Sequence, residues 1–248
     1  MSIKIENVVL PSPEQWEATI RGMRNPKNSW DRMDSYISTM ETVNDIGDIN
    51  EIELNFVLGE KDHKLMDNLN AGGPVHAKYR RMIPVYLDIT APLYWWKEFD
   101  TYKVGTVANS CSTMHKSHAN EFTLEDFSWE HLLSDPCYYE DGPHQDIKEP
   151  DYDWHRWYAP KEILEDWIIP SLNKCREAYL KTKDKRYWWQ MIQLLPSSYN
   201  QKRTVMLNYE VLVGIYRWRK DHKLDEWREF CEWIESLPYS ELITGKEG

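Results

Sequence analysis

Apolar side chains recur at two periods along this chain, and each period predicts one kind of element. Over residues 82–90 every second position, from Ile83 to Ile89, is apolar, which is the period of a β-strand. Pro84 cannot donate to a strand ladder, so we expect either an edge strand or a strand that begins at this proline. A shorter strand is expected over residues 3–10.

Helical spacing is most extended near the C-terminal end. From Lys202 to Arg219 the chain is predicted to form one long amphipathic helix, with apolar residues such as Val205, Leu212 and Ile215 at helical spacing. Four shorter helices are also expected. The first lies at about 60–70 and ends at Gly72, and the second begins at Pro92. The third covers 161–182 with a kink or split at Pro170, and the fourth covers 224–236.

Two polar residues, Asn208 and Arg219, fall inside the apolar stripe of the long helix. They are eleven positions apart, so at about 100° per residue they return to nearly the same side of a helix, roughly 20° apart. An arginine cannot be deprotonated and is costly to bury unpaired, so Arg219 needs an anion or a dense set of acceptors. Its partner is either a neighbouring carboxylate or a bound anionic ligand.

Polar segments separate these elements. Residues 41–56 are expected to form a polar connection. Arg21, Arg24 and Asn25 surround Gly22 and are expected to form a cationic turn, which is either solvated or in contact with a ligand.

Two further segments differ from the rest in composition. The loop over 103–112 is rich in small hydroxyl and amide side chains, which suit contacts with phosphate or carbonyl groups. From Asp135 to Trp157 the chain is acidic, aromatic and rich in Pro and Gly, so an insertion or lid is predicted at about 121–160.

Composition narrows the classes of function. With 248 residues and 41% hydrophobic content, the chain can form one large domain or two small ones. The net charge of −11 argues against a nucleic-acid polymer as partner, because such surfaces need clustered Lys and Arg. A small anionic ligand is possible where a few cations converge. The 13 Trp and 15 Tyr suit stacking pockets, subunit interfaces or an aromatic-rich core.

Common catalytic and metal motifs are absent from the sequence. There is no GxGxxG, Walker loop, HExxH or GxSxG, and the four cysteines show neither a CxxC pair nor regular spacing. His115 and His118 lack a nearby acidic or Cys ligand set, so we expect no metal. Cys111 and His115 could form a catalytic dyad, although packing or loop roles explain both more simply. Without an apolar signal region or a membrane-length apolar run, the chain is expected in the reducing cytoplasm, with no membrane partner.

The order of these features resembles the flavin-dependent thymidylate synthases, the thymidylate synthase complementing family. That family has a strand that runs to an Ala-Pro helix start, a polar loop of the type RHRxxSxNExSxR, and a Leu-Pro that precedes a long helix. Here a strand runs to Ala91-Pro92, and Leu195-Pro196 precedes the predicted long helix. The resemblance covers most of residues 60–115 and 190–230.

The resemblance implies roles for four matching residues. Asn109 and Ser112 match the spaced Asn and Ser of the polar loop, and they are expected to bind the cofactor and the substrate respectively. Asn208 and Arg219 stand at the family's spacing. Asn208 would contact the flavin ring, and Arg219 would hold and polarise the uracil of dUMP as the catalytic residue. Their common side of the helix suits one pocket, with the ring on the apolar stripe.

The resemblance also implies the fold and the reaction. The fold would be α+β, a single domain over residues 1–248 with a small antiparallel sheet and long helices. The reaction would be the reductive methylation of dUMP to dTMP, with NADPH, FAD and methylenetetrahydrofolate and no protein nucleophile. The family's sites lie at subunit junctions of a homotetramer, so a homotetramer is expected.

The chain departs from the family at its arginines. The RHR of the motif falls at about 102–104, where only Lys103 keeps a positive charge, and Lys97 replaces an arginine on the preceding helix. Both lysines are candidates for cofactor binding, as are Lys78 and Arg81 ahead of the strand.

Substitutes are also needed on the substrate side. Met114 stands at the motif's final arginine, so His115 or Lys116 is expected to hold the nucleotide phosphate. The family arginine before Leu-Pro is lost, and Gln193 lies close to that position. These changes leave two further functions open: a flavoenzyme that acts on another pyrimidine nucleotide, and a non-catalytic nucleotide-binding or assembly protein that keeps only the fold.

Overall fold

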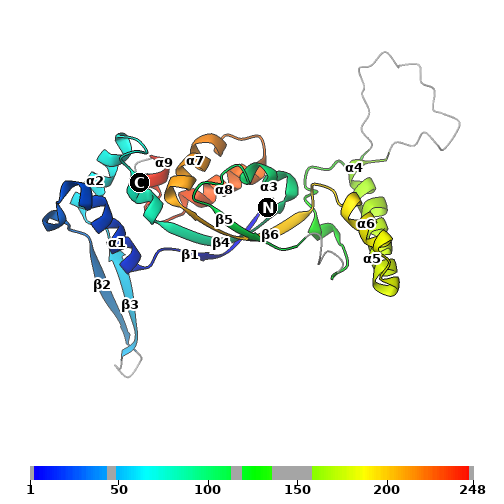
Figure 1. The fold of residues 1–248 in the computed structure, drawn as a ribbon, viewed down its shortest axis with the longest axis horizontal. Helices are drawn as coiled ribbons and strands as arrows, with labels where there is room; N and C mark the ends of the chain where they lie inside the picture. The colour runs from blue at the N-terminus through cyan, green and yellow to red at the C-terminus, as the bar shows by residue number, and fades with distance from the viewer. Residues whose placement is uncertain (1–2, 44–48, 113–118, 136–157, 246–248) are drawn as a thin grey trace, which may run out of the picture.

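A computed structural model of the chain describes residues 3–43, 49–112, 119–135 and 158–245 (Figure 1). Its centre is a four-stranded antiparallel sheet in the order β1-β4-β6-β5. The strands are β1 (Lys4–Val9), β4 (Pro84–Pro92), β6 (Asn200–Asn208) and β5 (Val107–Ser110). The predicted α+β class with a small antiparallel sheet is confirmed.

The alternation of apolar and polar residues that predicts β4 arises because one face of the sheet is buried. Val85 and Leu87 are buried, and they lie opposite Leu207 and Val205 of β6. β4 begins at Pro84, which confirms one of the two expectations for this proline. The strand lies inside the sheet rather than at its edge.

Three helices cover one face of the sheet (Figure 1): α3 (Leu93–Phe99), α7 (Tyr209–Arg219) and α8 (Asp225–Glu235). Aromatic rings fill the space between them. The ring of Trp95 lies 4.9 Å from that of Trp96 and 4.7 Å from that of Trp227, between centroids. Much of the aromatic excess therefore forms core. No helix of the described residues is long and apolar enough to cross a membrane.

The predicted long helix from Lys202 is wrong. Lys202–Asn208 belongs to strand β6, and the helix begins only at Tyr209. Buried and exposed side chains alternate over this stretch, because Val205 and Leu207 face the core while Thr204 is exposed. The helical spacing between Val205 and the apolar residues of α7 is a coincidence, because Val205 lies in the strand that precedes the helix.

The N-terminal part contains α1 (Pro13–Arg24) and α2 (Glu60–Ala71), joined by the antiparallel hairpin β2 (Tyr36–Val43) and β3 (Ile49–Val57). The helix expected at 60–70 is confirmed. The polar connection expected at 41–56 is wrong, because most of it lies in this hairpin, which projects from the body of the molecule (Figure 1).

Gly22 lies inside α1, so the cationic turn expected around it does not form. Short elements complete this part: η1 (Asn25–Lys27), η2 (Trp30–Arg32), η3 (Lys78–Met82) and α9 (Glu241–Thr244).

A second, smaller hydrophobic cluster lies at the opposite end of the molecule (Figure 1). Its helices are α4 (Pro160–Glu162), the π-helical η6 (Ile163–Ile168), α5 (Ile169–Thr182) and α6 (Lys185–Leu194). Pro170 has no N–H to donate to the carbonyl four residues earlier, so the π-helical change just before it follows from the sequence.

The predicted insertion or lid at 121–160 falls partly outside the described residues, at 136–157. Within its described part, Phe122 and Phe127 flank η4 (Leu124–Asp126) and are buried in the second cluster.

Candidate functional site

Arg219 ends α7 and lies against the C-terminal part of α3. Its Nη1 donates to Glu98 Oε2 at 2.6 Å, and its Nε donates to the hydroxyl of Tyr102 at 3.0 Å. The guanidinium lies over the ring of Trp227, 4.7 Å from the centroid, and His222 Nε2 lies 3.0 Å from Arg219 Nη1. Trp227 Nε1 donates to the same Glu98 oxygen at 2.9 Å. We call these five residues the Arg219 cluster.

The Arg219 cluster contains the neighbouring carboxylate that was one of two expected partners. The pair is incompletely buried, with 18% of the Arg219 side chain and 36% of the Glu98 side chain exposed. Arg219 Nη2 and Glu98 Oε1 have no hydrogen-bond partner in the described part of the chain. The cluster can therefore offer one donor and one acceptor to a ligand, and a ligand role for Arg219 stays a prediction.

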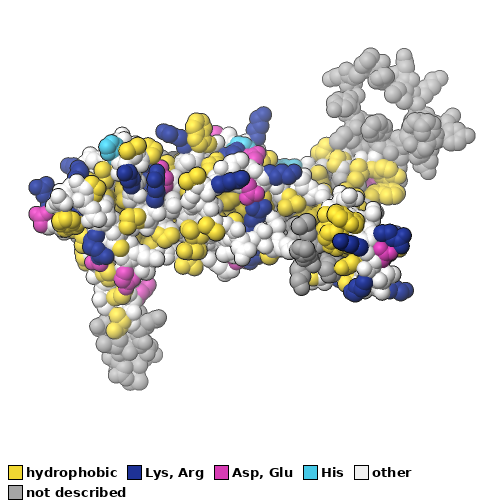
Figure 2. Space-filling model, in the orientation of Figure 1, with side chains coloured by type: hydrophobic (Ala, Val, Ile, Leu, Met, Phe, Trp, Pro, Cys, Tyr) yellow, Lys and Arg dark blue, Asp and Glu magenta, His cyan; other side chains and the backbone are white. Residues whose placement is uncertain are grey.

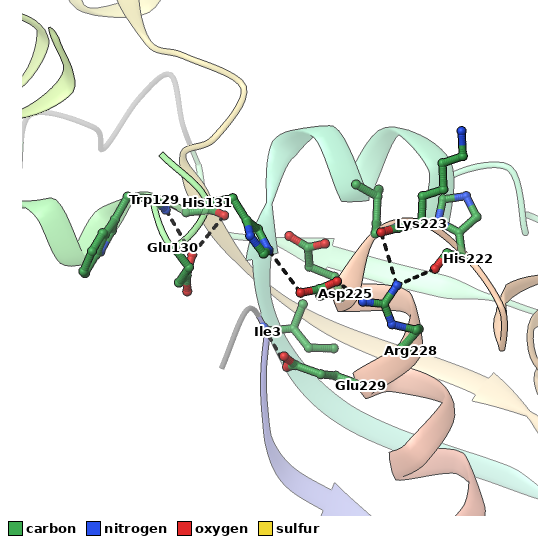
Figure 3. Close-up of polar contacts among 12 residues, drawn as sticks. Ile3, Trp129, Glu130, His131, His222, Lys223, Asp225, Arg228 and Glu229 are labelled. Atoms are coloured by element: carbon green, nitrogen blue, oxygen red, sulfur yellow. Dashed lines mark hydrogen bonds and ion pairs between the residues drawn. The ribbon is translucent and has the colours of Figure 1, made fainter. Parts of the chain in front are cut away.

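The turn after α7 is held in place by α8 and by the 119–135 segment (Figure 3). Arg228 Nη1 donates to the carbonyl of His222 at 2.8 Å, and Arg228 also pairs with Asp225. His131 reaches Asp225 from the other side, with Nε2 to Oδ2 at 3.0 Å. These contacts fix the backbone of His222 and so one side of the Arg219 cluster.

Asn208 lies at the opposite end of α7, where it caps the helix. Its Oδ1 accepts from the backbone N–H of Val211 at 3.1 Å. Gly105, with φ of +83°, approaches the same amide, because a Cβ at Gly105 would lie 3.1 Å from Asn208 Nδ2. Nδ2 has no hydrogen-bond partner among the residues that the structure describes. It can donate to a ligand beside the turn that carries Lys103.

Asn208 and Arg219 lie at the two ends of α7. Eleven residues at about 1.5 Å each separate Asn208 from Arg219 by roughly 16 Å along the axis. Asn208 precedes the helix, so the argument from a common helix side does not hold. The apolar stripe, with Leu212 and Ile215, is buried in the core, and this corrects the expectation that a flavin ring lies on it.

The four candidate cations for cofactor binding are exposed at two places. Lys97 is on α3 and Lys103 is in the turn that follows it, one residue after Tyr102 of the Arg219 cluster. Lys78 and Arg81 are on η3. η3 adjoins the first turn of α7, because its buried Arg80 donates from Nε to Glu210 Oε2 at 2.9 Å.

The remaining predicted residues lie elsewhere. Asn109 is exposed on the edge strand β5, opposite Thr204, and Ser112 is exposed just after that strand. Gln193 is exposed on α6 of the second cluster. His115 and Lys116 lie outside the described residues.

Several residues of the Arg219 cluster carry no signal in the sequence. Glu98 and Tyr102 follow an aromatic run, and His222 and Trp227 lie in the next turn and helix. Only the fold brings them together. Cys231 is unsuited to act as a nucleophile, because burial raises the pKa of its thiol to about 12 and the thiolate is the reactive form.

A cavity of about 870 Å³ lies beside α7 on another side, between α2 and α9. Its lining includes Asn70, Gly73, Tyr216, Arg217 and Lys220. None of the residues predicted for the flavin or nucleotide site lines it.

Comparison with known proteins gives a fold but no sequence family. No family model matches the chain, and no curated protein matches it in sequence. The flavin-dependent thymidylate synthase ThyX from Helicobacter pylori, in a complex with FAD and dUMP, is similar in structure, with a TM-score of 0.55 and 13% identity over 98% of this chain and 97% of that one. The UMP/dUMP methylase PolB from Streptomyces cacaoi, bound with 5-Br dUMP, has a TM-score of 0.51 and 14% identity over 98% and 94% of the chains. This chain therefore has the ThyX-like fold over nearly its whole length.

Proposed function

We propose that this protein is a flavin-dependent enzyme that modifies the pyrimidine ring of a nucleotide, and that it methylates dUMP reductively to dTMP. The observation that carries the proposal is a fold shared over 98% of the chain with enzymes that hold dUMP or its 5-bromo analogue. The Arg219 cluster supports it, because its exposed part offers a cationic donor of the kind that stabilises negative charge on a ring carbonyl.

FAD fits the other end of α7. Asn208 Nδ2 is a donor with no partner among the described residues, and the absence of a Cβ at Gly105 lets the 103–105 turn approach this amide closely. Asn208 would hold the ring, while Lys103 and Lys97 would face the phosphates. Bound FAD would supply the hydride chemistry, with NADPH and methylenetetrahydrofolate as co-substrates. The protein would bind and orient the reactants, and in this proposal it acts as a homotetramer.

A second candidate is an enzyme for an aminopyrimidine nucleotide such as dCMP. The observation that favours it is Glu98, whose Oε2 is occupied by Arg219 and Trp227, while Oε1 has no partner in the described residues. A carboxylate oxygen accepts from the amino group of cytosine, whereas it repels the carbonyl oxygen that uracil has at that position.

Tritium release from C5-labelled dUMP, in the presence of FAD, NADPH and methylenetetrahydrofolate, tests the substrate and the chemistry together. We expect release that depends on all three additions. Tritium release from labelled dCMP but not from labelled dUMP would favour the second candidate.

A non-catalytic protein that keeps only the fold would give no release with either nucleotide. Its purified form would also lack bound flavin, which absorbs near about 450 nm. A colourless protein that takes up no FAD and turns over neither nucleotide would refute the proposed function.

A further inference from the structure

A second cavity, of about 670 Å³, lies at the end of the molecule formed by α1 and α2. Figure 2 shows Lys and Arg side chains over this end of the molecule. Five cations line the cavity: the buried Arg24 and the exposed Lys27, Arg32, Lys61 and Lys64. Asp31 is the single carboxylate and Leu65 the single apolar side chain of the lining. We call it the cationic cavity.

The cationic cavity has two walls. One is a stripe of α2, because Lys61, Lys64 and Leu65 are spaced three and four residues apart and share a helix face. The other wall is the segment 27–32, which contains η2. Cations from both walls therefore line one hollow.

None of the four exposed cations forms an ion pair within the described residues, whereas the buried Arg24 pairs with Asp62. With Asp31 counted, the exposed lining carries a net charge of +3, in a chain whose net charge is −11. Like charges around one hollow repel each other, and an anion in the hollow removes that repulsion.

The base of the cationic cavity is rigid. Arg24 is buried and donates from Nε to Asp62, which also accepts from the backbone N–H and the hydroxyl of Ser35 at 2.8 and 2.7 Å. Arg24 Nη1 donates to the carbonyl of Ser29, a lining residue, at 3.2 Å. This buried pair ties α1, α2 and the segment 27–32 together, so the cavity is formed before any ligand binds.

We propose that the cationic cavity binds a short chain of phosphates, as found in a nucleoside triphosphate or an inorganic polyphosphate. Several cations on two walls suit a ligand with several anionic groups. The volume lies within the range of about 300–1,000 Å³ typical of small-molecule sites, and the nearly apolar-free lining excludes a hydrophobic ligand. A nucleic-acid polymer is disfavoured, since the net charge of the chain is −11.

The cationic cavity shares no residue with the Arg219 cluster or with the residues assigned to FAD. Its occupancy is therefore measured by binding, without any reaction. Failure of the proposed dUMP chemistry leaves this proposal standing, and the reverse also holds.

Isothermal titration calorimetry of the full chain in about 0.1 M salt tests the proposal with tripolyphosphate, ATP and a 20-nucleotide single-stranded DNA. We expect tripolyphosphate to bind with a Kd below about 0.1 mM, and raised salt to weaken it. The double variant Lys61→Gln/Lys64→Gln is expected to weaken binding at least tenfold. The matched control Lys174→Gln/Lys181→Gln removes two exposed lysines from α5 and is expected to change the Kd by less than twofold.

Comparison with ATP distinguishes the two sources of a phosphate chain. Equal affinity for ATP and tripolyphosphate means that only the phosphates are recognised. Tighter binding of ATP means that the cavity also holds the nucleoside. If the double variant does not fold, Arg32→Gln on the other wall repeats the test. Absence of tripolyphosphate and ATP binding at millimolar concentration overturns the proposal. So does an equal loss in the control variant, or binding of the DNA alone.

Discussion

The substitution Arg219→Ala separates a structural role of the Arg219 cluster from a role in ligand binding. It removes the ion pair with Glu98, the hydrogen bond to Tyr102 and the stacking over Trp227. Both roles predict some loss of stability, so the control must lose equivalent contacts elsewhere. Arg203 offers that match, because it pairs with Asp100 at 2.7 Å and stacks 4.2 Å from the centroid of Trp96.

The expected loss of stability follows from the exposure of the pair. An ion pair that is 18% and 36% exposed contributes about 1 kcal/mol or less, and the stacked guanidinium adds about 0.5–1 kcal/mol. Arg219→Ala is therefore expected to cost about 1–2 kcal/mol, which lowers Tm by about 2–8 °C in a chain of this size. Arg203→Ala is expected to lower Tm by a similar amount.

The ligand role predicts a difference that stability does not explain. If Arg219 stabilises charge on the pyrimidine ring, Arg219→Ala lowers kcat/KM for dUMP at least about 100-fold, while Arg203→Ala changes it less than about threefold. Glu98→Gln removes the negative charge beside the guanidinium while its amide oxygen can still accept from Arg219, so it is expected to tighten dUMP binding and weaken dCMP binding. Tritium release and calorimetry measure these effects. Equal losses in the Arg219 and Arg203 variants would refute a ligand role and leave the pair with Glu98 as the whole function of Arg219.

The remaining predictions concern the buried pair, the helix cap and assembly. Asp62→Asn leaves Arg24 buried without an anion, so it is expected to cost about 3–5 kcal/mol and to lower Tm by at least about 6 °C, as followed by circular dichroism. Burial alone would raise the pKa of Asp62, but hydrogen bonds from Ser35 and Arg24 outweigh it and hold the pKa below its ordinary value. The stabilisation that comes from the lowered pKa is therefore complete above about pH 4 and is lost as pH falls through the lower folded value, and the Asn variant is expected to lack this part of the acid dependence. Asn208→Ala removes the helix cap at a cost of about 1 kcal/mol, whereas Asn208→Ser keeps the cap. Loss of FAD affinity in both variants identifies Nδ2 as a flavin contact. Loss in the Ala variant alone contradicts that role. Refolding the Asn208→Ala and Arg219→Ala chains together is expected to restore up to about a quarter of the unmodified protein's activity if one site uses both residues from different chains. Activity no higher than that of either variant alone would count against such a shared site.

Periodicity predicted the elements whose burial depends on one face. β4 and α8 fall where the spacing of apolar residues places them. It failed at β6, because the buried face of that strand includes Gln201. This glutamine can be buried because its side-chain Nε2 donates to the backbone carbonyl of Cys111 at 2.7 Å, and its backbone carbonyl accepts from Trp96 Nε1 at 2.9 Å. Those partners are distant in sequence, so the alternation is hidden from a local pattern.

The partner of Arg219 is hidden for a related reason. Glu98 precedes it by 121 positions, and nothing in the spacing of charges links the two. The sequence does require that a charged side chain in a packed region meets an acceptor, and that requirement holds for Arg219, Arg24 and Arg80 alike. What the sequence leaves undetermined is which acceptor serves, since this depends on how α3 lies against α7.

The separation of Asn208 and Arg219 bears on the assembly of the proposed enzyme. A flavin and a nucleotide that react must be in contact, yet these two residues lie at opposite ends of α7, roughly 16 Å apart. If both serve one reaction, an assembly that places the Asn208 end of one chain beside the Arg219 end of another would bring them into one site. The surface agrees with this arrangement, because Val104, one residue from Gly105, is 93% exposed, and Trp218, one residue from Arg219, is 73% exposed. Large apolar side chains at both ends are what a contact between chains would cover, and such a contact is therefore expected in the proposed homotetramer.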